Sequence, residues 1–184
     1  MEKLDYFKIR KGDVVVILGA CRGHNVLFYS PKVGGEGHIV AIEPIEKNYV
    51  VLQDVITKTS YNNITLFNLA IGAETGEGAI YIGSNAINAS MCRDQKLGEQ
   101  TVKIVTWNDL MELADLTYVT LANVDVEGSE LQWLSGMTEC LPQYIIMEEH
   151  SRYGYNLETL LNTLKEKEYT YVKEGYHIYA ERKN

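Results

Sequence analysis

Short apolar runs alternate with amphipathic segments along this chain of 184 residues. The first run, residues 14–18, reads Val-Val-Val-Ile-Leu and is followed directly by Gly19. A wholly apolar run of this length, rich in β-branched side chains, is typical of a strand that is buried on both faces of a sheet. We therefore predict that residues 14–18 form a central parallel strand.

The same alternation continues to the end of the sequence. Further strands are predicted at residues 38–42, 64–69, 118–126, 144–148, 169–173 and 176–180. Helices are predicted at residues 24–30, where Pro31 ends the first one, at 45–58, at 129–140, and around Leu157, Leu160, Leu161 and Leu164. A tight turn at Glu174-Gly175 makes the last strand antiparallel to its neighbour. The pattern predicts an α/β fold, a doubly wound and mostly parallel sheet with helices on both faces.

One segment interrupts the alternation after the third strand. Residues 79–82 and 102–105 look like strands, and they flank a polar stretch at residues 83–100. We predict a β-hairpin insertion with a long loop. The chain has no internal repeat and no linker-like tract, so residues 1–184 are expected to form a single domain.

Composition narrows the classes of function. Hydrophobic residues make up 46% and charged residues 23%, as in folded globular proteins, and the net charge of −8 argues against a nucleic-acid partner. Cys21, Cys92 and Cys140 form no Cys-x-x-Cys pair and are expected to be free thiols of a reducing compartment. The sequence shows neither a signal peptide nor a stretch of membrane-spanning length. We expect a cytoplasmic protein without a membrane partner.

The first candidate for chemistry is the loop Gly19-Ala20-Cys21-Arg22-Gly23, which follows the first predicted strand. Its glycines allow the backbone to approach a ligand closely, and the start of the next helix offers free N–H groups. A tight turn that simply needs small residues is the structural alternative. The loop lacks the third glycine of Gly-x-Gly-x-x-Gly, which counts against a nicotinamide dinucleotide.

Polar residues also follow the second and third strands. Glu43, with Pro44 after it, lies about twenty residues beyond the glycine loop, where a carboxylate can accept hydrogen bonds from the ribose hydroxyls of an adenosine group. The alternative for Glu43 is an exposed carboxylate at a strand end. Asn68 and Ala70 stand where they can form a wall beside an adenine, although ordinary core residues explain that pattern equally well.

Two acidic groups follow later strands: Asp125, Glu127 and Glu130, and then Glu148, Glu149 and His150. Clustered carboxylates raise one another's pKa, which is compatible with a general base or with a metal site. Glu148, Glu149 and His150 are either catalytic or part of a solvated loop. His150 is the best single candidate for a catalytic base, because an imidazole titrates near neutral pH, and Asp125 is the other candidate. For Glu130, stabilisation of a helix start is the simpler interpretation. We assign no metal ligands from the sequence.

Five short blocks of the sequence, taken in chain order, carry a resemblance to a known family. They are residues 19–23 (Gly-Ala-x-x-Gly), 37–44, 68–72, 106–110 (Thr-Trp-Asn-Asp-Leu) and 124–130 (Val-Asp-Val-Glu-Gly-Ser-Glu). Together they resemble the FkbM-type methyltransferases, a branch of the class I enzymes that use S-adenosylmethionine, over residues 12–179. The resemblance implies a Rossmann-like sheet of seven strands with an antiparallel last strand. It also implies methyl transfer to a hydroxyl of a small-molecule acceptor, a sugar or a secondary metabolite.

The resemblance further implies that the cofactor contacts Gly19, Ala20, Cys21, Gly23, Glu43, Pro44, Asn68, Ala70 and Asp125. The chain departs from the family at four positions: the family has an acid at Ile17, Asn at Cys21, Asp at Asn108 and Lys at Asn123. The acid and the first Asn line the methionine end of the family's pocket. A catalytically inactive binding module is therefore the first alternative function. A nucleotide-dependent oxidoreductase is the second, disfavoured by the missing glycine.

Overall fold

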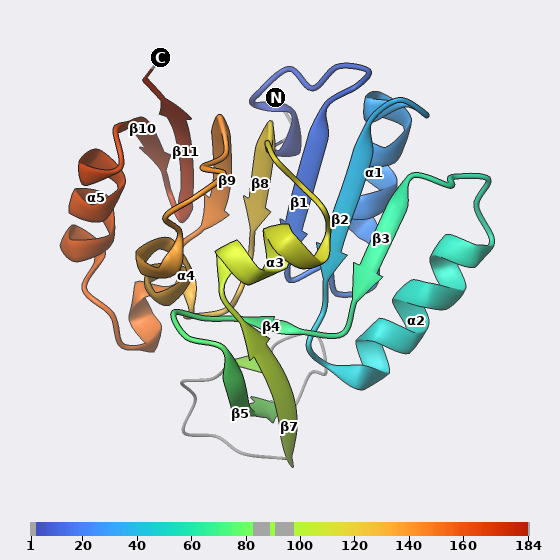
Figure 1. Ribbon diagram of the computed structural model, residues 1–184. Helices are drawn as coiled ribbons and strands as arrows, with labels where there is room; N and C mark the ends of the chain where they lie inside the picture. Colours follow the sequence, from blue (N-terminus) through green and yellow to red (C-terminus); the bar gives the residue numbers. More distant parts are fainter. Residues whose placement is uncertain (1–2, 83–88, 91–97, 184) are drawn as a thin grey trace.

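A computed structural model describes residues 3–82, 89–90 and 98–183. Its main sheet has the strand order β10-β11-β9-β8-β1-β2-β3 (Figure 1). These strands are β1 (Val14–Leu18), β2 (His38–Ile42), β3 (Ile64–Phe67), β8 (Leu121–Val124), β9 (Tyr144–Glu148), β10 (Tyr169–Glu174) and β11 (His177–Arg182). Neighbouring strands are parallel, except that β11 is antiparallel to β9 and to β10. The predicted seven-stranded sheet with an antiparallel last strand is confirmed.

Strand β1 lies between β2 and β8 and packs against both helical layers. Val16 and Leu18 belong to the apolar core on one face of the sheet, and Val15 and Ile17 belong to the core on the other. All four side chains are fully buried. This burial on both faces is why the strand reads as a continuous apolar run rather than as an alternating one.

Five helices within the described residues cover the two faces (Figure 1). They are α1 (His24–Val33), α2 (Glu46–Thr57), α3 (Trp107–Leu113), α4 (Glu130–Gly136) and α5 (Leu157–Glu166), with short 3-10 helices at Lys3–Asp5 and Ser151–Tyr153. Helices α1 and α2 pack on one face, and α3, α4 and α5 pack on the other. None of these helices is long and apolar enough to cross a membrane.

Helix α1 does not end at Pro31, so that prediction was wrong. The helix continues to Val33, whose side chain is fully buried, and the Gly34 N–H donates to the Ser30 carbonyl at 3.2 Å. Proline lacks an N–H, which deprives the Leu27 carbonyl of its partner in the helix. Leu27 is 39% exposed, so water can take that place. The burial of Val33 therefore outweighs the lost bond.

Helix α4 is shorter than predicted and ends at Gly136 instead of residue 140. A Cβ atom at Gly136 would lie 3.2 Å from the Gly72 carbonyl oxygen, so this turn of the helix packs directly on another backbone segment. The next residue, Met137, is extended and fully buried. The helix ends because Met137 turns into the core, a tertiary contact that the local sequence does not contain.

The predicted insertion forms a second, smaller sheet in the order β4-β7-β5-β6. Its strands are β4 (Ala70–Ile71), β5 (Gly76–Ile82), β6 (Ala89–Ser90) and β7 (Gly98–Val105), and β5 pairs antiparallel with β7 as a hairpin requires. The small sheet lies beyond the carboxyl ends of the main strands (Figure 1). Most of the predicted polar loop, residues 83–88 and 91–97, lies outside the described residues.

Candidate functional site

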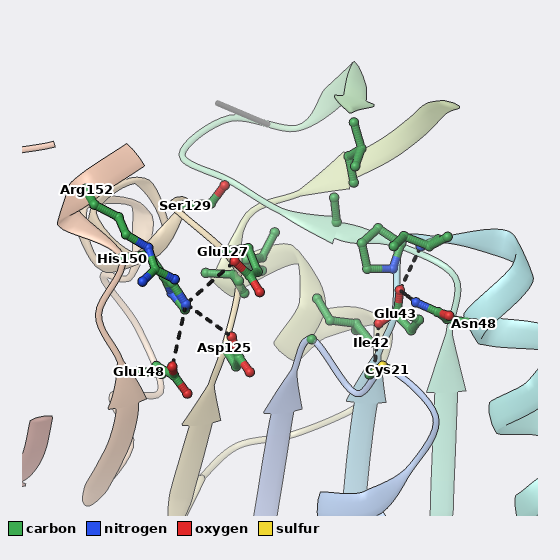
Figure 2. Close-up of a pocket in the computed structure, with 17 residues that line it drawn as sticks. Cys21, Ile42, Glu43, Asn48, Asp125, Glu127, Ser129, Glu148, His150 and Arg152 are labelled. Atoms are coloured by element: carbon green, nitrogen blue, oxygen red, sulfur yellow. Dashed lines mark hydrogen bonds and ion pairs between the residues drawn. The ribbon is translucent and has the colours of Figure 1, made fainter. Parts of the chain in front are cut away.

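A cavity of about 330 Å³ opens where β1, β2, β8 and β9 end, between the main sheet and the small sheet. Its two ends differ in chemistry (Figure 2). Glu43, Asn48, Cys21 and Ile42 stand at one end, while His150 stands at the other among three carboxylates and Arg152. Apolar side chains line it as well, among them Ile42 at the end of β2, Ile45 before α2, and Ile71 and Ile80 of the small sheet. Cavities with apolar walls and a few converging polar groups are the usual form of a ligand site.

The glycine loop after β1 crosses close to the loop after β8. Gly19 has a φ of 84°, and a Cβ atom there would lie 1.9 Å from the backbone oxygen of Asp125. No residue with a side chain fits at that distance. The N–H groups of Gly19 and Ala20 both donate to the Ile42 carbonyl, which fixes the loop against the end of β2. Gly23 has a φ of 94° and starts helix α1.

Glu43 connects the glycine loop to the start of α2. It is 4% exposed, and its carboxylate accepts hydrogen bonds from the Cys21 N–H at 2.8 Å and the Ile45 N–H at 2.9 Å. The Asn48 side-chain amide donates to the same carboxylate at 3.5 Å. Burial raises the pKa of Glu43, and these hydrogen bonds oppose that shift. The carboxylate is therefore a buried acceptor whose position is set by the backbone.

Two amides outside the cavity lining hold the segment that follows Glu43. The Asn68 side chain donates to the carbonyls of Glu43 at 2.8 Å and of Pro44 at 3.1 Å. Gln100, on β7, donates to the Pro44 carbonyl at 2.9 Å and accepts from the Glu46 N–H at 3.2 Å. The small sheet is thereby attached to the rim of the cavity.

His150 is the centre of the acidic end. The ring is 3% exposed, and Nδ1 lies 2.7 Å from Oε1 of Glu130, which is itself fully buried and also accepts from the Gly128 N–H. The ring stacks on Tyr153, with 5.6 Å between centroids. Burial lowers the pKa of His150, but the Glu130 hydrogen bond and the charges of Glu130, Glu127 and Asp125 outweigh it, so the pKa is raised.

Asp125 faces His150 from the end of β8. Its Oδ1 atom is 4.0 Å from Nε2 of His150, while 44% of the side chain is exposed toward the cavity. Loss of solvent around the carboxyl group raises the pKa of Asp125 to about 7, with Glu127, Glu148 and Glu130 adding to the shift and His150 opposing it. A carboxyl group with such a pKa can both bind a cation and exchange a proton near neutral pH.

The backbone is strained on both sides of this cavity. Cys21 has a φ of 48° and Glu127 a φ of 49°, a left-handed conformation that residues with side chains seldom adopt. Both residues line the cavity. Strain of this kind costs about 1–3 kcal/mol per residue and is concentrated at functional sites.

The sequence-predicted residues divide into two groups. Those that line the cavity are Gly19, Cys21, Glu43, Pro44, Ala70, Asp125 and His150. Ala20, Gly23 and Asn68 are outside the lining, and the Asn68 side chain binds the backbone carbonyls of Glu43 and Pro44. Within the described residues, Cys21 and Cys140 are free thiols as predicted, while Cys92 lies outside that part of the chain.

Of the four departures from the family, only Cys21 borders the cavity. Ile17 lies in the apolar core beneath α1, is fully buried and does not line the cavity. Asn123 accepts a hydrogen bond from Asn25 at 2.7 Å. Asn108 binds Thr138 and the Glu139 N–H in the turn after α4. These two residues have structural roles.

Glu130, Asn48 and Arg152 are among the residues of the site that the sequence did not assign to it. Glu130 was interpreted as a helix start, but it is the hydrogen-bond partner of His150. Asn48 and Arg152 line the cavity without having been singled out. Arg152 stands two residues after His150, and this spacing was the available signal.

Residues 18–172 match the family model of the Methyltransferase FkbM domain. The chain is 26% identical over 133 residues to the hexuronic acid methyltransferase AglP of Haloferax volcanii, which covers 70% of this chain and 54% of that protein. This chain therefore spans about half the length of that curated relative.

Two solved structures resemble the fold. The methyltransferase FkbM from Methylobacillus flagellatus has a TM-score of 0.69 at 18% identity, over 96% of this chain and 45% of that one. Fibrillarin from Aeropyrum pernix, solved with natively bound S-adenosyl-L-methionine, has a TM-score of 0.60 at 14% identity, over 95% of this chain and 68% of that one. At these identities the likeness concerns the fold alone.

Proposed function

Because this chain belongs to the FkbM methyltransferase family, we propose that it transfers a methyl group from S-adenosylmethionine to a hydroxyl of a small-molecule acceptor, with a sugar as the acceptor class. The observation that carries the proposal is the cavity itself. One end holds a buried carboxylate suited to a ribose, and the other holds His150 and Asp125. The similarity to a protein described as a hexuronic acid methyltransferase supports the choice of a sugar.

The residues present fit the cofactor. Ile42, Pro44 and Ile71 offer an apolar surface for an adenine beside Glu43. A carboxylate oxygen can accept two hydrogen bonds, so Oε2 of Glu43 can accept a ribose hydroxyl in addition to the Cys21 N–H. The Asp125 carboxylate also lines the cavity and is partly exposed there, and its negative charge suits the positively charged methionine end.

We assign the cofactor contacts to Gly19, Cys21, Glu43, Pro44, Ala70 and Asp125. Ala20, Gly23 and Asn68 keep an indirect role, because they position these residues and do not line the cavity. Bound S-adenosylmethionine supplies a methyl group on a positively charged sulfur, and the protein has to orient the acceptor hydroxyl toward it.

His150 and Asp125 are the side chains that would act on the acceptor hydroxyl. Nε2 of His150 is directed toward the cavity because Nδ1 is held by Glu130. It can accept the hydroxyl proton as the methyl group is transferred, and Asp125 can take the same role through its carboxylate. Arg152, also in the lining, offers a positive charge for a carboxylate such as that of a uronic acid.

The first test is calorimetry with S-adenosylhomocysteine on the wild type and on Glu43→Gln. The substitution keeps the volume of the side chain but removes its charge, and a charged acceptor facing ribose hydroxyls contributes about 1.5–3 kcal/mol. We expect affinity to fall by at least about tenfold. Glu46→Gln is the matched control, because Glu46 is an exposed acid only three residues away.

Equal binding by wild type and Glu43→Gln would remove Glu43 from the cofactor site. The acceptor class is tested by transfer of labelled methyl groups to hexuronic acids, neutral hexosides and phenols. Labelling of the sugars is the expected result. Binding of S-adenosylhomocysteine without transfer to any hydroxyl compound would favour the catalytically inactive binding module.

A further inference from the structure

Three metal-binding types of side chain converge at the acidic end of the cavity. One ligand atom each from Asp125, Glu127 and His150 lie within 4.8 Å of one another. Nε2 of His150 is 3.6 Å from Oε2 of Glu127 and 4.0 Å from Oδ1 of Asp125 (Figure 2). Metal–ligand bonds of about 2.0–2.2 Å place neighbouring ligand atoms roughly 3–4 Å apart. A shift of less than about 1 Å would close this arrangement around an ion.

The histidine is held in the orientation of a metal ligand. Its ring is 3% exposed, and Nδ1 is bound at 2.7 Å to Glu130, a fully buried carboxylate. Ligating histidines donate their second ring N–H to such a carboxylate, which fixes the tautomer and leaves the other nitrogen to the metal. The contacts of Nε2 with Glu127, Glu148 and Asp125, at 3.6, 3.8 and 4.0 Å, are all longer than a hydrogen bond.

The charge around Nε2 also favours a cation. Carboxylates of Asp125, Glu127 and Glu148 face one imidazole nitrogen, and Oδ1 of Asp125 is buried with no hydrogen-bond partner among the described residues. Arg152 also lines the cavity, but its guanidinium lies over the rings of Tyr153 and Tyr176, at 4.9 and 5.8 Å from their centroids. Four carboxylates, those of Asp125, Glu127, Glu130 and Glu148, lie around His150, so acidic groups outnumber the two basic ones, His150 and Arg152, among the cluster residues named here.

We propose that Asp125, Glu127 and His150 bind a divalent transition-metal ion, through one oxygen of each carboxylate and Nε2 of the imidazole. Three protein ligands leave coordination positions open toward the cavity. There the ion would hold the acceptor hydroxyl. This role rests on the proposed function, but the metal-binding site does not depend on it. With the ion bound, His150 and Asp125 would serve as its ligands, and the Glu148 carboxylate, which also faces Nε2 and lines the cavity, would accept the proton of the acceptor hydroxyl.

The ligand types indicate which ion to use. Carboxylates suit Mg²⁺ and Mn²⁺, whereas an imidazole favours later transition metals, so the mixed set selects Mn²⁺ over Mg²⁺. Mn²⁺ is also directly observable, because its free form has a strong electron paramagnetic resonance signal that bound Mn²⁺ loses. The experiment titrates Mn²⁺ into the 184-residue chain after treatment with EDTA and exchange into metal-free buffer.

We expect one Mn²⁺ per chain, with Asp125→Asn and Glu127→Gln each weakening binding at least tenfold. Glu130→Gln, which changes the partner of His150 without touching the ion, should weaken it by about 10–100-fold. Glu158→Gln, an exposed acid on α5, is the matched control and should bind Mn²⁺ like the wild type. Thermal unfolding in EDTA shows whether each variant is folded.

Three results would overturn the metal site. They are no binding of Mn²⁺, binding by Asp125→Asn and Glu127→Gln as tight as by the wild type, and displacement of Mn²⁺ by S-adenosylhomocysteine, which would give the acidic cluster to the cofactor. Calorimetry with S-adenosylhomocysteine in EDTA separates the two proposals. Cofactor binding without Mn²⁺ binding leaves the function and removes the metal site, and Mn²⁺ binding without cofactor binding does the reverse.

Discussion

Glu43 holds the loops beside the cavity together from the inside. One of its oxygens binds the Cys21 N–H and the other binds the Ile45 N–H, so a single carboxylate fixes two segments that follow different strands. The first bond holds Cys21 in its left-handed conformation. Asparagine adopts this conformation more readily than cysteine, which gives a backbone reason for the Asn that the family has at this position. Cys21 keeps the geometry of the loop with a different side chain.

The Cys21 thiol should react slowly with iodoacetamide. Burial raises its pKa, the negative charge of Glu43 adds to the shift, and only the thiolate is nucleophilic. Its alkylation rate should therefore still rise at a pH where the same cysteine in the denatured chain has levelled off. Peptide mass spectrometry separates Cys21 from Cys92 and Cys140. Identical rate–pH curves for the folded and denatured chains would contradict this prediction.

Ile17 is an example of a residue whose side-chain direction could not be predicted from the sequence. The family resemblance identifies position 17 as unusual, but only the structure shows which way the side chain points. Ile17 packs with Val26 and Tyr29 of α1 on the face of β1 away from the cavity. An acid there would be buried among apolar groups, so isoleucine is the residue that this core accommodates. The Glu130–His150 pair was missed for a similar reason, because it joins the start of α4 to the loop after β9, 20 residues later in the chain.

The two loops after β1 and β8 form one structural unit. They touch where Gly19 passes the Asp125 carbonyl, and the Asp125 N–H donates to the Leu18 carbonyl at 2.9 Å. The glycine end of the cavity and its acidic end are therefore mechanically connected. A substitution that displaces one loop should therefore displace the other loop as well.

Gly19→Ala tests this connection. The new methyl group would clash with the Asp125 carbonyl, and alanine at a φ of 84° is strained. We expect the free energy of unfolding to fall by about 2–4 kcal/mol and binding of S-adenosylhomocysteine to weaken. Gly35→Ala is the control, because a Cβ atom there meets nothing within 4 Å. Equal denaturant midpoints for the two variants would show that the loops can move apart.

Helices and strands could be predicted where the local pattern of apolar residues and turn residues is sufficient to determine them. The buried runs of β1, β2 and β9 gave the strands, and the hairpin at Gly175 gave the antiparallel end of the sheet. The boundaries that failed depend on partners elsewhere. Pro31 stays inside α1 because Val33 is buried, and the third strand stops at Phe67 because the Asn68 side chain binds the loop after β2.

The whole site is assembled from four strand ends that are dispersed along the sequence. The cavity combines residues from the loops after β1, β2, β8 and β9 with Ile80 from the small sheet. The rule that ligands bind at the carboxyl ends of parallel strands predicted this location. It could not predict which side chains would meet there, because loop paths set those contacts and periodicity does not describe them.

The central position of β1 also has a consequence for synthesis on the ribosome. The Val14 N–H donates to the Thr120 hydroxyl, which is 106 residues later in the chain, and β1 pairs with β8 directly after this point. One edge of β1 therefore has no neighbouring strand until β8 has been synthesised. At about 5–20 residues per second this interval lasts roughly 5–20 s, during which an apolar edge is open to chaperones or to a neighbouring nascent chain. Nascent chains stalled before residue 118 should be digested by protease faster than complete 184-residue chains that an added C-terminal linker holds clear of the ribosome. Equal resistance would mean that the first strands already form a stable unit.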